Sequence, residues 1–152
     1  MDASSDAEAL ARVDAADALH DAAAIVRELA AQLGSELVVY RCCEALQKYE
    51  TARAAAALPD VLLLLLKALR SHANCDVVAS VWRALAASLQ NGANADSIIE
   101  QGALELALAA VCGTPTDAKK GKSSLAVFYH LAFPKHVARA VQLGGVEVRF
   151  HW

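Results

Sequence analysis

Apolar residues recur every three or four positions along most of the chain, the spacing that places them on one face of an α-helix. The first such stripe follows a capping-box pair, Ser5 and Glu8, and stops at Gly34-Ser35. Its members are Leu10, Val13, Ala16, Leu19, Ala23, Val26, Ala30 and Leu33. No run of alternating β-branched residues is bounded by hairpin turns. The pattern predicts an all-α protein whose first helical region ends at Leu33.

Two further helices are predicted in the next part of the chain. One covers 36–50, and its apolar side consists of Leu37, Val38, Val39, Cys42, Cys43 and Leu46. The other covers 61–69, with Pro59 at a position that the first helical turn tolerates. This helix is apolar on nearly every side, so we expect it to be internal.

The pattern continues beyond residue 76 with the same spacing. A helix ending near Asn91-Gly92 is expected to turn Val78, Val81, Trp82, Leu85 and Leu89 towards the core. Ser97 and Glu100 repeat the capping spacing before a short turn of helix. Helices over 104–111 and 125–133 follow, separated by a loop that contains Pro115.

The chain also resembles itself at a fixed interval. Ile98 to Leu106 aligns with Ala140 to Val148 at a shift of about 42 residues, and Val38 to Leu46 aligns with Val77 to Leu85 at about 39. Leu125 to Ala132 is a third copy of the second pattern. A period near 40, with a short helix before two longer ones, is typical of armadillo and HEAT repeats, which stack to share one core.

The motifs at two junctions carry the resemblance. Gln101-Gly102-Ala103-Leu104 and Leu143-Gly144-Gly145-Val146 look like the armadillo junction between first and second helices, and Leu58-Pro59 retains the proline of that pattern. Glycine permits a sharp bend or a positive φ there. The chain, over about 21–148, therefore resembles the armadillo repeat family, with HEAT as the close neighbour. The resemblance implies a single domain, 1–152, that forms a right-handed α-solenoid with repeats at about 6–52, 53–92 and 93–134 and a partial repeat at 135–152.

In this family the third helix of each repeat lines a concave groove that binds a peptide or helix of a partner. The corresponding helices here are about 36–50, 76–90 and 119–133, and their outward positions are the candidate contact residues. These are Arg41, Glu44, Lys48, Ser80, Arg83, Gln90, Lys122, Tyr129 and His130. Nuclear-import carriers of this fold repeat a tryptophan followed one turn later by asparagine, whereas Trp82 is followed by Ala86. We therefore disfavour the function of an import carrier. We interpret Trp82 as an aromatic side chain of the core in preference to a binding platform in the groove.

The last residues suggest a second way of binding. A long helix is expected after Val148, but the sequence ends with Arg149-Phe150-His151-Trp152. An uncovered terminal repeat would leave core surface in water, so either the chain is truncated or Phe150 and Trp152 dock on a partner that covers it. The alternative function is accordingly a permanent subunit of a larger assembly or an oligomer, held through its terminal or convex faces.

Composition and charge narrow the classes of partner. The sequence is 57% hydrophobic, yet its longest apolar run, Val61 to Leu66, is stopped by Lys67, so no membrane insertion is expected. The acidic start lacks the pattern of a secretory signal, which predicts a cytoplasmic protein, with nuclear or ciliary placement as alternatives. A net charge of -3 argues against a nucleic-acid partner and favours a protein or peptide. Four cysteines without a metal-ligand spacing predict buried reduced thiols.

No residue constellation in the sequence supports catalysis. Gly121-Lys122-Ser123-Ser124 imitates the end of a phosphate loop, but Thr116 occupies the position of the required first glycine. The five histidines are scattered, and Tyr129-His130 has no accompanying nucleophile. We expect no enzyme activity, no small-molecule substrate, no cofactor and no metal.

Overall fold

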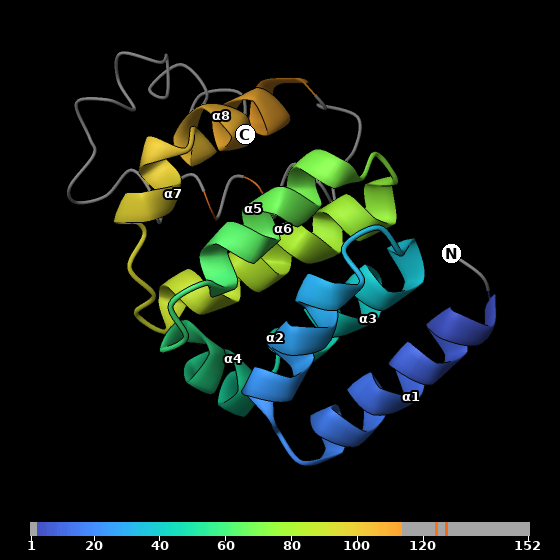
Figure 1. Ribbon diagram of the computed structural model, residues 1–152. Coiled ribbons are helices and arrows are strands. Elements are labelled where there is room, and N and C mark those ends of the chain that lie inside the picture. The colour runs from blue at the N-terminus through green and yellow to red at the C-terminus, as the bar shows by residue number, and fades with distance from the viewer. Residues whose placement is uncertain (1–2, 114–123, 125–126, 128–152) are drawn as a thin grey trace.

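The computed structural model describes residues 3–113 together with Ser124 and Val127, and in these residues all regular structure is helical. The all-α prediction is thus confirmed for the described part of the chain (Figure 1). The helices are α1 (Ala3–Ala18), α2 (Ala22–Ala31), α3 (Glu36–Leu46), α4 (Tyr49–Ala56), α5 (Val61–Ser71), α6 (Cys75–Gln90), α7 (Asp96–Glu100) and α8 (Ala103–Gly113).

Each helix packs against helices that lie one, two or three positions away in the sequence. α1, α2 and α3 contact each other, and α6 lies against both α4 and α5. Among the described helices, the most extensive contact joins α3 to α6. α7 contacts α5 and α8, so the helices progress from α1 at one side of the molecule to α8 at the other (Figure 1).

The first predicted helical region is two helices, and the prediction of a single one is wrong. The chain turns at His20, whose φ is 53°. The backbone N–H of Asp21 donates to the carbonyl of Ala16 at 2.9 Å, and that of His20 donates to Asp17 at 3.1 Å. These two bonds form a Schellman closure of α1. The Asp21 carboxylate then accepts from the N–H of Ala24 at 3.1 Å and caps α2.

This turn also shifts the buried stripe to a new set of residues. Leu19 was expected in the core but is 78% exposed at the turn. Ile25 and Leu29, which the continuous stripe omits, are fully buried. Ala30, which the stripe includes, is exposed. A single helical period cannot run through a residue in the left-handed region, so the count restarts at α2.

The second predicted helix ends earlier than residue 50. α3 stops at Leu46, and Lys48 is an extended residue that precedes a separate helix, α4. Most of the predicted apolar side of α3 is buried, but Leu37 is 62% exposed and does not belong to the core. Val38 and Val39, the next two residues, take the inward positions.

α5 is the internal helix that its composition predicts. It contacts α2, α6 and α7, and six of its residues are buried. Its first residue is Val61, and Asp60 is its N-cap. Pro59 therefore lies before the helix and not in its first turn, while the predicted start at residue 61 is confirmed. Proline suits this position because it cannot donate a backbone hydrogen bond.

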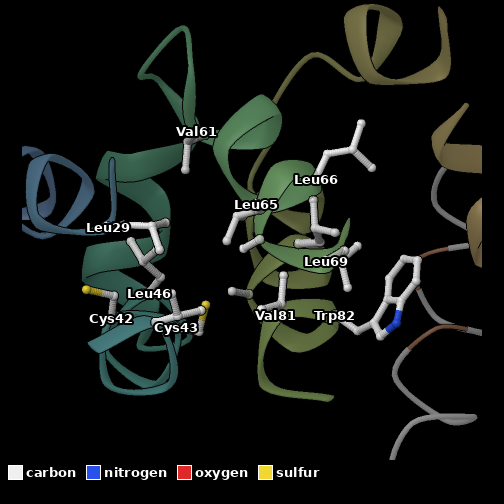
Figure 2. Packing of buried hydrophobic residues seen from close by; sticks show 14 of the residues in the cluster. Leu29, Cys42, Cys43, Leu46, Val61, Leu65, Leu66, Leu69, Val81 and Trp82 are labelled. Atoms are coloured by element: carbon white, nitrogen blue, oxygen red, sulfur yellow. The ribbon is translucent and has the colours of Figure 1, made fainter. Parts of the chain in front are cut away.

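The core is centred on α6, where ten of the sixteen residues are buried. Figure 2 shows Cys43 and Leu46 of α3 directed towards Val81, while Trp82 extends from the other side of α6. Trp82 is 2% exposed, so its interpretation as a core aromatic is confirmed. Val127 belongs to the same hydrophobic cluster.

Two glycines have the backbone conformation that their positions require. Gly92, at the end of α6, has a φ of 91°, and the N–H of Ala93 donates to the carbonyl of Ser88 at 3.1 Å. Gly102, between α7 and α8, has a φ of 89°. The positive φ expected at the Gly102 junction is confirmed. Arg70 of α5 also donates to the carbonyl of Gln101 here, which joins α5 to the end of α7.

Candidate functional site

Two of the predicted groove residues, Arg41 and Lys48, are engaged in ion pairs with α1. The Arg41 guanidinium lies 2.9 Å from Asp14 and 2.7 Å from Asp17, and the Lys48 ammonium lies 2.7 Å from the same Asp17 oxygen. The Asp17 side chain is buried, while that of Lys48 is half exposed. These two cations therefore attach α1 to the region of α3. From the sequence pattern alone, both are predicted to contact a partner.

The pairing is strong enough to govern the ionisation of Asp17. Burial alone would raise the pKa of this carboxyl group, but hydrogen bonds from Arg41 and Lys48, together with their charges, lower it overall. The same bond to Asp17 raises the pKa of Arg41 against the opposing effect of burial. The carboxylate is thus charged inside the protein because two cations face it.

Asp17 could have been found from the sequence. It follows Ala9, Val13 and Ala16 at helical spacing, and these three residues form the buried side of α1. An acidic residue within an apolar stripe needs a cationic partner when it is buried. The missing information was which lysine or arginine lies opposite, because this depends on the turn at His20.

The predicted position of Ser80 on the outer surface is contradicted. Ser80 is fully buried between α6 and α3. The Gln47 amide of α3 lies 3.3 Å from its hydroxyl oxygen and 3.0 Å from the carbonyl oxygen of Cys43. The long Gln47 side chain therefore covers a small residue that helical spacing alone places on the outside. Ser80 contributes to the contact between the two helices and is removed from the candidate site.

The other predicted residues of α3 and α6 do reach the surface. Glu44 and Gln90 are exposed, and Arg83 is half-buried. Glu44 lies one turn from Gln47 on α3, and Arg83 lies one turn from Ser80 on α6. The bond between Gln47, at the C-cap of α3, and Ser80 brings the end of α3 close to the first half of α6.

We name this surface the α3–α6 face. It is defined by six exposed or half-buried residues, on the stripe of α3 that contains Glu44 and the stripe of α6 that contains Arg83. They are Leu37, Tyr40, Glu44, Arg83, Ala87 and Gln90. The face therefore combines one acidic, one basic and two large apolar side chains.

Sequence reasoning missed the apolar part of this face. Leu37 was assigned to the core, and Tyr40 was not assigned at all. The signal is their spacing, because Leu37, Tyr40 and Glu44 follow each other at three and four residues and so share one stripe of α3. That stripe faces outwards because the opposite side of α3 is buried, at Val38, Val39, Cys42 and Cys43.

The remaining predicted contact residues lie outside the described residues. They are Lys122, Tyr129 and His130 of the third groove helix, and Phe150 and Trp152 of the C-terminal face. The candidate site is therefore built from α3 and α6.

The prediction of buried thiols is confirmed for the two cysteines of α3 and is wrong for Cys75, which is exposed. Cys42 and Cys43 are buried, and burial raises the pKa of Cys42 to about 12 and raises that of Cys43 as well. A thiol with so high a pKa is neutral at physiological pH and is a poor nucleophile. Within residues 3–113, no group of three His, Cys, Asp or Glu side chains could hold a metal ion.

Comparison with known proteins adds no assignment to this geometry. No model of a protein family, no curated protein and no solved structure matches the chain. The armadillo resemblance accordingly stays a prediction. None of the described helices combines the length and apolar character that crossing a membrane requires.

Proposed function

We propose that this chain is a non-catalytic protein-binding module of armadillo-like repeats, which holds a peptide or helix of a partner across the α3–α6 face. The helix lengths support the repeat assignment. An 8-residue α4 precedes an 11-residue α5 and a 16-residue α6, and a 5-residue α7 then precedes an 11-residue α8. This order, short and then long, is the one that the family predicts. The second repeat would begin at Tyr49, close to the predicted boundary at 53.

The packing of α3 against α6 supports the same assignment. In a stack of three-helix units, the third helix of one unit lies beside the third helix of the next. α3 and α6 would hold these positions in the proposed repeats, and they share the most extensive helix contact among the described residues. Their outward stripes would then form part of the surface that a partner contacts.

The observation that carries the proposed function is the pair of exposed apolar side chains on α3. Leu37 is 62% exposed, and Tyr40 is 37% exposed one helical turn away. A single exposed leucine is ordinary on a protein surface. Two large apolar side chains on the outward stripe of a helix otherwise lined by polar groups favour a contact site, and tyrosine is enriched among residues that dominate binding energy.

The charges on the face suggest the chemistry of the partner segment. Glu44 lies one turn from Tyr40 on α3, and Arg83 lies on the neighbouring helix. A segment with one apolar anchor and polar or oppositely charged flanks would complement both charged side chains, Glu44 and Arg83. The mixed signs disfavour a polyanion such as nucleic acid as the occupant.

The N-terminal end offers little support for the alternative of a permanent subunit. Between residues 5 and 18, the exposed positions of α1 carry only alanine or a charged residue: Ala7, Glu8, Ala11, Arg12, Asp14, Ala15 and Ala18. Such a surface has no large apolar side chain that could anchor a second subunit. The alternative therefore rests on Phe150 and Trp152, which lie outside the described residues.

A selection from a random peptide display library tests the proposal. We expect peptides selected on the wild-type chain to bind a Leu37→Ser/Tyr40→Ala variant at least about tenfold more weakly, since the anchor side chains are lost. Tyr49→Ala is the matched control, because Tyr49 is 69% exposed but lies on α4, away from the α3–α6 face. Selected peptides that bind the double variant as tightly as the wild type would refute the proposal.

A further inference from the structure

The turn between α1 and α2 is short and carries backbone strain. It consists of Leu19, His20 and Asp21, and His20 is the one residue other than glycine with a positive φ among those the structure describes. A side chain in the left-handed region is unfavourable because Cβ approaches the following carbonyl oxygen. At the comparable end of α6, the same position is filled by Gly92.

The sequence permits a different conformation at this turn. From Ala3 to Leu33 it contains neither glycine nor proline, and alanine is its commonest residue. Alanine has the highest helix propensity, so a continuous helix through the turn is locally favourable. The uninterrupted apolar spacing from Leu10 to Leu33 reflects the same property.

The contacts that the described residues show for α1 are made with groups that a second copy would offer equally well. Ala9, Val13 and Ala16 are its buried residues, and they face α2 and α3. Its ion pairs join Arg12 to Glu28, and Asp14 and Asp17 to α3 and Lys48. Every one of these partners lies beyond the turn in sequence.

We propose that α1 is exchanged between two copies of this chain. In the exchanged dimer the turn opens, α1 and α2 become one helix, and α1 of each copy packs on α2 and α3 of the other. The contacts of α1 are then the same as in the monomer, while the strain at both His20 residues is relieved. Domain exchange of this kind is favoured by short strained hinges, and the loss of translational freedom opposes it. The dimer is therefore expected at high protein concentration, and this inference is independent of the proposed function.

Two substitutions at the hinge test the proposal in opposite directions. His20→Gly relieves the strain of the closed turn and weakens a continuous helix, whereas His20→Ala keeps the strain and favours that helix. Because both chains of a dimer contain the hinge, the dimerisation constant of His20→Ala should exceed that of His20→Gly by at least about tenfold. Sedimentation velocity over a range of concentrations measures it. Equal constants, or monomers for both variants at millimolar concentration, would overturn the proposal.

A cross-linking experiment identifies the contact within the dimer. Chains carrying Arg12→Cys are mixed with isotope-labelled chains carrying Glu28→Cys, both with Cys75→Ser and Cys112→Ala, and treated with a short bis-maleimide. Exchange predicts a linked peptide joining residues 12 and 28 of different chains in the dimer fraction. As a control, a monomer that carries both cysteines should give the link within one chain. If this control is linked and the dimer gives no linked peptide between chains, the dimer is associated in another way and the proposal is contradicted.

Discussion

The carboxylate of Asp17 lies 2.7 Å from the guanidinium of Arg41, and this pair joins α1 to α3 across 24 residues of sequence. Arg41 is a residue that the armadillo resemblance places on a binding surface. Its position beside Asp17 gives it a structural role, and the same carboxylate also holds Lys48. The N-terminal helix is thus attached by charge as well as by the small side chains Val13 and Ala16.

Loss of Asp17 is expected to destabilise the protein more than loss of its neighbour Asp14. Asp17→Ala leaves Lys48 without its partner and should lower the free energy of unfolding by about 1–2 kcal/mol, because the carboxylate is buried but the cations reach solvent. Asp14→Ala is the matched control, since this side chain is 62% exposed, and it should cost less than about 0.5 kcal/mol. Urea unfolding measures both. Equal losses would contradict a special role for Asp17.

The stability contributed by Asp17 should depend on pH. Its pKa in the folded protein lies below the ordinary value of 3.8, so the folded state binds this proton less readily than the unfolded chain. The contribution is complete above the unfolded pKa and is lost as the pH falls through the folded one. The difference in unfolding free energy between wild type and Asp17→Asn should therefore be constant above about pH 5 and shrink below it. A difference that grows on acidification would show the opposite shift.

Substitutions at two of the left-handed helix ends, Gly92 and His20, should act in opposite directions. A methyl group at Gly92 meets no atom within 4 Å, so Gly92→Ala tests backbone strain alone. It should destabilise by about 1 kcal/mol. His20→Gly removes strain at the corresponding position of α1 and should leave the unfolding free energy unchanged or raise it by several tenths of a kcal/mol. Thermal and urea unfolding at low protein concentration measure the unfolding free energies of both variants. A stabilising Gly92→Ala would refute this account.

Ser80 should affect stability and leave binding unchanged. Ser80→Ala removes the acceptor of Gln47 but retains the bond from Gln47 to Cys43, so a loss of about 0.5–1 kcal/mol is expected. Ser80→Leu should cost about 1–3 kcal/mol by overpacking the contact between α3 and α6. The affinity of Ser80→Ala for selected peptides should equal that of the wild type. A specific loss of affinity would return Ser80 to the binding surface.

Much of the fold follows from the sequence because helical periodicity is a local property. The apolar run of α5, the core position of Trp82 and the positive φ of Gly102 are each determined by the residue and its near neighbours. The break at His20 is not, since no glycine or proline marks it. The burial of Ile25 and Leu29 becomes favourable when α1 folds back onto α2 and α3.

The candidate site was predicted less well for the same reason. Helical spacing places Ser80 and Arg41 outwards on their own helices, but what covers them comes from other helices. Gln47 reaches Ser80 from α3, and Asp17 reaches Arg41 from α1. Leu37 shows the reverse error, because an apolar residue beside Val38 and Val39 was assigned inwards although α3 turns it out. Contacts between distant segments decide both cases.

Amide chemical-shift mapping of a selected peptide on the isotope-labelled chain tests the central claim most directly. The proposal predicts that the largest shifts on titration cluster on the α3–α6 face, at Tyr40 and Glu44 of α3 and at Arg83 and Gln90 of α6. Residues of α1 and the exposed Tyr49 of α4 should shift little. Shifts centred on α1 or α4, with the α3–α6 face unchanged, would contradict it.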